Sequence, residues 1–556
     1  PYYRDELHGQ YRLPWVYLHA MKDYSDMAWH LEQNPDIRLT VNFAPVLLEQ
    51  LSDYAKQIDD FIQQGIPMKD HMLNLLAGAI PIPKKGKERN KIIVDCQRCN
   101  EATMIEPWPP FRRLVKYADT LTHKATTNLA ALGYFSKQYF YDLLTWYHLT
   151  WLGHGLKQDP RAKRLLTKGS HFSDEDRGEL LELIHECLRD ILPRYKALAE
   201  RGQIELSMTP WGHPIVPLLH DFDNMKCSQP NDPRPKERHY PDGKERTRWH
   251  MQHGIELFES CFGMRPQGVW LSEGSISHDA LELLDEFDIK WTASGENVWL
   301  NSARISELDE DLISSKRGLF RPYINGEHKC RMFFRDDGLS DLIGFEYRNW
   351  ATEDAVANFA MHIDNITKFL GDEADDCVIS VILDGENAWE YFPDNAYRFL
   401  DRLYQEIEDN KKIEPVTFSD ASQQLTPATM EKICPGSWVF GTFSTWIGSK
   451  EKNRAWDLLV EAKHCYDHAI SSSRLSEEQQ EQATRQLAIC EGSDWFWWFG
   501  DYNSAESVRD FDRLYRRQLR MLYQLLLLLP PSSLDIPISR GITHSMGESG
   551  TMRRNI

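Results

Sequence analysis

The sequence predicts an α/β protein in which a parallel sheet is followed by a helical region. Short apolar or β-branched runs recur through residues 1–394, and most of them end in polar residues. Helical patterns separate most of these runs, whereas residues 395–556 contain amphipathic helical patterns and no convincing buried strand. Strands that alternate with helices in this way form parallel sheets with both faces covered. We therefore expect two domains, one at 1–394 and a helical one at 395–556.

Six runs are the predicted strands. They lie at residues 37–45, 204–214, 268–275, 288–296, 330–338 and 377–386. The last of them reads CVISVILDGE, and its apolar stretch at 378–383 is typical of a fully buried strand. If such strands close into a barrel, the side chains at their carboxyl ends gather on one rim. His213 and Glu273 follow strands in this position, and so do Asp384 and Glu386, so we expect all four at that rim.

The helical elements have recognisable ends. Ser277 is the expected N-cap of a helix that follows the third run. A second helix is expected from Thr352, with an acidic first turn, to Gly371. Two inserts interrupt the alternation. Residues 47–201 are mostly helical, and residues 228–246 are rich in proline and charge, as in a long loop at the rim.

The composition excludes several classes of partner. The chain of 556 residues carries a net charge of −20, whereas a surface that binds nucleic acid must be basic. The longest apolar run, at 525–531, is too short to cross a membrane, so we expect no membrane partner. Ten cysteines in so long a chain do not make a disulfide framework, and the pair Cys96 and Cys99 is too isolated to indicate zinc or redox chemistry. We expect free thiols and a cytoplasmic location, and the sequence does not indicate the oligomeric state.

Carboxylates at a barrel rim, together with many aromatic side chains, suggest chemistry on sugars. The chain holds 18 Trp, 22 Tyr and 24 Phe, and aromatic faces stack on sugar rings. Hydrolysis of a glycosidic bond needs one carboxylate that attacks or activates water and one protonated carboxyl group that assists the leaving oxygen. Glu273 and Asp384 come from different strand ends, as two groups that flank one bond must. Spacing does not choose between Asp384 and Glu386, and the alternative is that all three acids are exposed loop residues or partners of arginine.

Four motifs resemble those of glycoside hydrolase family 57, the family of α-amylases and α-glucanotransferases. In chain order they read TPWGHPIVPLL, GVWLSEGSIS, LDGENAWEYFPDN and EGSDWFWWFG, and they are similar to the second to fifth sequence regions of that family. The opening PYYRDELHGQYRLPWVYLHAMKDY resembles the segment that comes after the family's first region, a His-Gln-Pro at the end of the first strand. The resemblance implies an incomplete TIM-like (β/α)7 barrel and a C-terminal helical domain that helps to shape the cleft. One strand ahead of Pro1, ending in His-Gln, would bring the six predicted strands to seven.

The resemblance also implies the roles of the site residues. Family members retain the anomeric configuration and carry a Glu nucleophile in the third region and an Asp acid/base in the fourth, which correspond here to Glu273 and Asp384. The residues expected to bind substrate are His213, Trp270, Glu386, Asp494 and Trp497. No cofactor or metal is implied, and the expected substrate is an α-glucan such as starch or glycogen, or a maltooligosaccharide. Two departures from the family pattern, at Leu271 and at 500–503, put the substrate preference in question.

Several activities fit this resemblance. We favour hydrolysis of α-1,4-glucosidic bonds of the α-amylase type, and 4-α-glucanotransferase, amylopullulanase and branching activity are close alternatives. A metal-dependent (β/α)7 enzyme, such as a deacetylase or an α-mannosidase, needs Asp and His ligands at strand ends, and the sequence shows no convincing histidine pair. A glucan-binding protein without catalytic activity is the non-enzymatic alternative.

Overall fold

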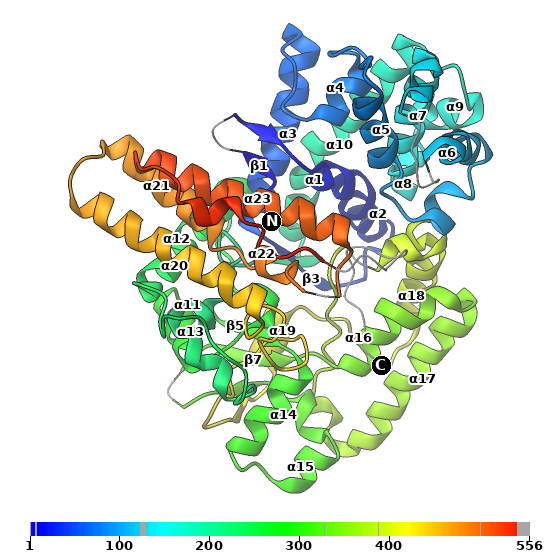
Figure 1. Cartoon of the computed structure of the whole chain (residues 1–556). Coiled ribbons are helices and arrows are strands. Elements are labelled where there is room, and N and C mark those ends of the chain that lie inside the picture. The colour runs from blue at the N-terminus through cyan, green and yellow to red at the C-terminus, as the bar shows by residue number, and fades with distance from the viewer. Residues whose placement is uncertain are drawn as a thin grey trace.

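The computed structural model describes residues 2–5, 8–122, 129–326, 328–386, 388–500 and 502–541. Expectations that concern Pro1, Asp501 and the sequence ahead of Pro1 lie outside these residues. Figure 1 shows a mixed α/β molecule in which helices predominate and surround the longer strands. None of the helices in the described ranges combines the length and apolar character that crossing a membrane requires.

Parallel pairing links the six predicted runs in chain order. β3 (Leu39–Phe43) pairs with β4 (Ile204–Met208), and β5 (Trp291–Ser294) pairs with β7 (Arg331–Phe334). Single bridges supply the other links, which join Met208 to Val269, Gly268 to Trp291, and Arg335 to Ser380. All of these links are parallel, as the alternation of strands and helices predicts. Among the described residues no ladder joins β3 to residues 377–386, so the observed pairing does not include closure into a barrel.

The prediction of a fully buried strand at 378–383 is wrong. Only Ser380 forms a bridge there, and the other side chains of this stretch are half-buried. Its backbone forms hydrogen bonds with segments outside a strand ladder. The N–H of Val378 donates to the carbonyl of Phe320 at 2.8 Å, and the N–H of Ile382 donates to Ser340 Oγ at 3.2 Å. Partners so distant in sequence cannot be read from a local apolar run.

The run at 268–275 also differs from a regular strand. It makes single bridges at Gly268 and Val269 and then turns sharply at η5 (Ser272–Gly274). The turn occurs because Glu273 adopts a left-handed backbone conformation, with φ 58° and ψ 29°, which cannot continue a strand. The result is a shorter strand and a more tightly defined position for Glu273.

Helices fill the chain between β3 and β4. The longest are α3 (Pro45–Gln64) and α10 (Asp174–Glu200), which pack against each other. α10 begins at a capping box in which Ser173 and Asp176 satisfy each other's backbone N–H groups. The other helices of this stretch are α4 (His71–Ala77), α5 (Gly86–Cys96), α6 (Pro109–Thr122), α7 (Lys137–Thr150), α8 (His154–Lys157) and α9 (Pro160–Lys168).

The N-terminal segment precedes β3 and lies against these helices. It consists of the short strands β1 (Arg4–Asp5) and β2 (Gln10–Tyr11), then α1 (Trp15–His19), the π-helix η1 (Ala20–Tyr24) and α2 (Ser25–Gln33). η1 and α2 both contact α10. Most side chains of η1 are buried, including the charged Lys22 and Asp23.

The two helices whose ends were predicted are confirmed. α13 (His278–Glu286) begins where Ser277 accepts a hydrogen bond from the N–H of Ala280. α17 (Thr352–Leu370) has an acidic first turn and ends at Gly371, whose φ is 58°. The predicted rim loop is shorter than expected, because α12 (Gly243–Phe262) begins inside it. The remaining helices before residue 425 are α11 (Val216–His220), α14 (Glu296–Ile305), α15 (Glu310–Ser314), α16 (Asp337–Asp341), α18 (Tyr397–Asp409) and α19 (Phe418–Gln424).

The described residues beyond 425 contribute four α-helices, the 3-10 helix η12 (Ser532–Asp535) and one short strand. α20 (Lys450–Ser471), α21 (Glu477–Cys490) and α23 (Ala505–Leu525) pack together, and α22 (Asp494–Trp497) precedes α23. In Figure 1 these helices run from orange to red beside the blue N-terminal hairpin. β8 (Ala428–Thr429) pairs in parallel with β6 (Tyr323–Ile324), so residues beyond 394 also join the sheet. The division into domains at residue 394 stays a prediction.

The expectation that all cysteines are free is wrong for one pair. Cys227 and Cys434 form a disulfide across 207 residues of sequence, and the other eight cysteines are free. Their spacing gave no signal, because only the fold brings them together. The disulfide joins the segment ahead of α12 to the loop that leads to Trp438.

Candidate active site

Glu273 is held in one position by the turn that carries it. The N–H of Gly274 donates to the carbonyl of Leu271 at 2.7 Å, and Ser294 Oγ donates to the carbonyl of Gly274 at 2.5 Å. A side chain at Gly274 would meet the ring of Trp270 at 2.8 Å, so this position requires glycine. A non-glycine residue in the left-handed region costs free energy, and such strain persists only where the surroundings enforce it.

Trp438 clamps Glu273 from the loop that follows the disulfide. Its indole Nε1–H donates to Glu273 Oε2 at 2.9 Å, and its backbone N–H donates to the carbonyl of Glu273 at 3.0 Å. The guanidinium of Arg335 lies 5.3 Å from the Trp438 ring centre, and Trp270 packs edge-on against the same ring at 5.4 Å. Sequence reasoning missed Trp438, because its partner lies 165 residues away and no local pattern marks it.

Several carboxyl groups gather around Glu273. Burial raises the pKa of Glu273 above its ordinary value, and the negative charge of Asp384 raises it further. The charges of Asp494 and Glu386 act in the same direction, while the N–H of Trp438 opposes them. The structure therefore brings together the two predicted catalytic carboxylates and both predicted substrate-binding acids.

Glu386 faces side chains of the N-terminal segment. Burial raises its pKa to about 7, His19 opposes that change, and Asp384 and Asp23 add to it. His19 Nδ1 lies 2.7 Å from Asp23 Oδ2, which orients the ring. The charge of Glu386 also contributes to the raised pKa of Tyr24, although burial is the larger cause. π-Helical turns such as η1 often occur at functional sites.

The sequence contains a signal for the charged residues at the end of α1 and in η1. His19, Lys22 and Asp23 stand in the stretch YLHAMKDY, where charged residues interrupt an apolar pattern. Charged residues are seldom buried unless they are paired, so such an interruption indicates a paired or functional group.

His213 connects the β4 end of the sheet to the C-terminal helices. Its Nδ1 lies 2.7 Å from Ser493 Oγ, and its carbonyl accepts the N–H of Ser493 at 2.9 Å. Like Glu273, it has a left-handed backbone, with φ 58°. Burial lowers the pKa of His213, although the neighbouring Asp494 opposes this. A neutral imidazole bonded through Nδ1 keeps Nε2 for a second partner.

A buried ion network fixes the loop that carries His213. Glu491 accepts hydrogen bonds from Arg246 Nη2 and from Tyr240, both within 2.9 Å, and lies 2.9 Å from His250 Nε2. The other nitrogen of His250 accepts the N–H of Gly212 at 3.0 Å. Glu491 therefore links α12 and the loop before His213 to the end of α21.

Trp497 is less closely tied to the carboxylates than the other predicted residues. It is half-buried in α22, with Trp498 edge-on at 4.8 Å and Tyr502 at 6.1 Å. The neighbouring Trp495 and Phe499 are buried in the core, which is consistent with packing roles. Within the described part of the chain, no hydrogen bond joins the Trp497 side chain to Glu273.

The described residues contain no group of three or more His, Cys, Asp and Glu side chains placed to hold a metal ion. The expectation that the chemistry uses no metal stays a prediction, which activity in the presence of EDTA tests.

Acidic side chains at the carboxyl ends of runs within one set of parallel-linked strands, in a mixed α/β fold, are typical of glycoside hydrolases. The chain belongs to glycosyl hydrolase family 57, whose family model matches residues 1–434. This confirms the resemblance that the four motifs indicated.

Individual relatives are distant. A 4-α-glucanotransferase of Thermococcus litoralis is 23% identical over 266 residues, which make up 46% of this chain and 32% of that protein. The chain thus spans about a third of the length of this curated relative. Among solved structures, a branching enzyme from Pyrococcus horikoshii matches with a TM-score of 0.53 and 16% identity, covering 100% of this chain and 97% of the other. An α-amylase of Thermotoga maritima matches with a TM-score of 0.50 and 13% identity, covering 96% and 94%. At such identities these structures show the fold alone.

Proposed function

We propose that the chain is an α-glucan-active glycosidase that works by double displacement, with Glu273 as nucleophile and Asp384 as acid/base. The observation that supports this most is that Glu273, in the motif that resembles the family's third region, has its backbone fixed in a tight turn and its Oε2 held at 2.9 Å by the Trp438 N–H, with the charge of Asp384 contributing to its raised pKa. In the first step Glu273 attacks the anomeric carbon while Asp384 protonates the leaving oxygen. In the second step Asp384 deprotonates water, or the hydroxyl group of an acceptor sugar, and Glu273 is released.

The electrostatics bear on these roles in two ways. A neighbouring carboxylate raises the pKa of a carboxyl group, which helps one member of such a pair to keep the proton that general acid catalysis requires. The raised pKa of Glu273 would by itself suit a general acid, whereas the N–H of Trp438 stabilises its charged form, as a nucleophile needs. We assign Glu273 as nucleophile because its motif resembles the family region that carries the nucleophile.

The surrounding residues have positioning and binding roles in this proposal. His213 offers Nε2 to sugar hydroxyl groups, Glu386 and Asp494 accept hydrogen bonds from them, and Trp270 and Trp497 provide aromatic surfaces. The proposal also includes an incomplete (β/α)7 barrel as the scaffold, which the six runs linked in chain order support. Double displacement requires the Glu273 and Asp384 carboxyl groups to lie about 5–5.5 Å apart when substrate is bound, and a separation of roughly 9 Å would indicate inversion.

Hydrolysis of the α-amylase type is the activity that we favour. The activities named for similar proteins include glucanotransferase, branching enzyme and α-amylase, so transfer to a second glucan is the main alternative. Incubation with maltoheptaose, followed by separation of the products by size, distinguishes them. Hydrolysis gives only shorter chains and one new reducing end per bond cleaved. A glucanotransferase gives chains longer than the substrate without new reducing ends, and a glucan-binding protein without activity leaves maltoheptaose unchanged.

A further inference from the structure

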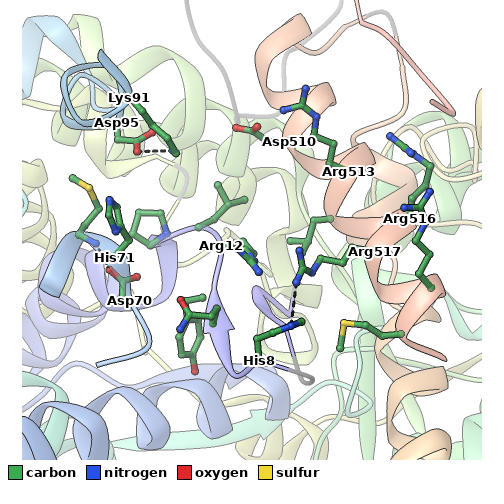
Figure 2. Close-up of a pocket in the computed structure, with 18 of the residues that line it drawn as sticks. His8, Arg12, Asp70, His71, Lys91, Asp95, Asp510, Arg513, Arg516 and Arg517 are labelled. Carbon is green, nitrogen blue, oxygen red and sulfur yellow. Dashed lines mark hydrogen bonds and ion pairs between the residues drawn. The ribbon is translucent and has the colours of Figure 1, made fainter. Parts of the chain in front are cut away.

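A cavity of about 790 Å³ lies apart from the carboxylate cluster. Figure 2 shows it between the N-terminal hairpin of β1 and β2, the helical stretch that contains His71 and Lys91, and α23. None of the predicted site residues lines it. Its size is that of a site for a small organic molecule.

The charges that line this cavity are mainly positive. Among the described residues, seven arginine and lysine side chains face three aspartates there. The basic residues are Arg12, Lys91, Arg98, Arg513, Arg516, Arg517 and Arg520, and the acidic ones are Asp70, Asp95 and Asp510. The whole chain carries a net charge of −20, so a cavity wall on which basic side chains outnumber acidic ones differs from the average of the chain. Whether this wall can attract an anion depends on which of its basic groups lack a carboxylate partner.

Most basic groups at the edge of the cavity have their own acidic partners. Arg98 pairs with Asp510 and Glu506, each at 2.8 Å. The other pairs are Lys91 with Asp95, Arg516 with Asp512, and Arg520 with Asp535. These four basic groups face five carboxylates, so they leave no excess positive charge for a ligand.

Three arginines of the cavity have no carboxylate partner of their own among the described ion pairs. Arg12 and Arg517 share a single carboxylate, that of the fully buried Asp5, and His8 also lies 3.2 Å from it. Arg517 Nη2 is in addition 3.1 Å from His8 Nδ1. Arg513, one turn before Arg517 on α23, is exposed, and no acidic partner is described for it. Two guanidinium groups thus meet one carboxylate, and a third stands beside them without any.

The guanidinium groups of Arg12, Arg513 and Arg517 determine which class of ligand the cavity favours. Guanidinium groups are planar donors that bind phosphate through paired N–H bonds. Apolar side chains complete the wall of the cavity, and these are Tyr11, Leu13, Pro14, Met72, Leu514 and Met521. We propose that this cavity binds a small phosphate-bearing molecule, with its phosphate on Arg12, Arg513 and Arg517 and any organic group against the apolar wall.

The position of the site gives it a structural consequence. Arg12 belongs to the N-terminal hairpin segment and Arg517 to α23, and Gln518 of α23 already donates to the carbonyl of Arg4 at 3.0 Å. A phosphate held by both arginines joins the first and last parts of the described fold. Because it binds only the folded state, it raises the thermal stability of the protein.

Calorimetric titration of the full chain at low ionic strength tests the proposal. The probes are inorganic phosphate, pyrophosphate, glucose 6-phosphate and AMP, so that the first two represent free phosphate and the last two phosphate esters. We expect one ligand per chain and a rise in Tm with at least one probe. Tighter binding of the esters identifies a role for the apolar wall, and equal binding identifies free phosphate as the ligand.

Substitutions on α23 distinguish a specific phosphate-binding site from a general attraction of anions to a basic surface. Arg513→Gln removes a guanidinium that has no described ion partner, so folding is expected to be kept, and binding should weaken roughly tenfold. Arg517→Gln should weaken it by at least as much. Arg509→Gln is the matched control, because Arg509 is an exposed arginine on the same helix that does not line the cavity, and it should leave binding within about twofold.

Three results would overturn the proposal. The first is the absence of binding by all four probes. The second is equal weakening by Arg513→Gln and Arg509→Gln. The third is binding of heparin without binding of any small phosphate, which would indicate a surface for a polyanionic chain. Hydrolysis or transfer on maltoheptaose should be unchanged by Arg513→Gln, so this test does not depend on the proposed catalytic pair.

Discussion

Glu273 and Asp384 have separate roles in double displacement, and substitution distinguishes them. Glu273→Gln removes the nucleophile, so turnover should fall to the background level, and added azide should restore part of the activity as a glycosyl azide. Asp384→Asn removes the acid/base, so starch should be cleaved poorly. Substrates with good leaving groups need little protonation, so the rate of their first step should change little. Rates on starch and on an aryl maltooligosaccharide measure both effects. If Asp384→Asn keeps full activity on starch and Glu386→Gln is inactive, the acid is Glu386.

Trp438 influences the ionisation of the Glu273 carboxyl group. Trp438→Phe keeps an aromatic ring but removes the N–H that donates to Glu273 Oε2. That bond favours the ionised form, so without it the pKa of Glu273 rises further. Because a nucleophile must be ionised, the acidic limb of the pH profile of kcat/KM should move to higher pH, and kcat should fall by about tenfold or more. Trp270→Phe is the control, since its N–H has no described carboxylate partner. An unmoved acidic limb in Trp438→Phe would contradict this role.

At the scale of elements, the Glu491 network should determine how firmly α12 and α21 hold the His213 loop. Glu491→Gln leaves the charge of Arg246 buried without its counter-charge, which should lower the free energy of unfolding by about 3 kcal/mol. Burial alone would raise the pKa of Glu491, but Arg246 and His250 lower it to about 2, against an ordinary value of 4.5. The stabilisation is therefore complete above about pH 4.5 and is lost as the pH falls toward 2.

Thermal melts of the wild type and of Glu491→Gln across this pH range measure the effect. Their difference in Tm should shrink as the pH falls. Glu481→Gln, an exposed position on α21, is the control and should change stability by less than about 0.5 kcal/mol. A constant difference in Tm at all pH values would show that the charge of Glu491 is not what stabilises the loop.

The sequence predicted elements well where local patterns decide the structure. The ends of α13 and α17 follow from an N-cap serine and a terminal glycine, which act within one turn. The parallel order of the six runs follows from their alternation with helices. The stretch 378–383 was mispredicted because its backbone partners, Phe320 and Ser340, come from distant segments. Trp438 and the Cys227–Cys434 disulfide were missed for the same reason, since only the folded chain brings them to their partners.

At the scale of the whole molecule, the candidate site depends on the entire fold. Glu386 faces His19 from the N-terminal segment, Glu273 is clamped by Trp438, and His213 is bonded to Ser493, 280 residues away. No single element holds these groups. Truncation before residue 434 would keep most of the chain that the family model matches but would remove Trp438 and Ser493. We expect such a fragment to lose activity, as measured on maltoheptaose beside the full chain.

The anomeric configuration of the first products tests the central claim most directly. Glu273 and Asp384, acting by double displacement, must give products that keep the α configuration of the glucan. Proton NMR of a maltoheptaose reaction, recorded before mutarotation, reports whether each newly formed anomeric centre is α or β. The same measurement applies to a free reducing end after hydrolysis and to a new linkage after transfer. We predict α signals from the earliest time points, and their loss in Glu273→Gln. Initial β signals would mean inversion, and the assignment of Glu273 as a covalent nucleophile would be wrong.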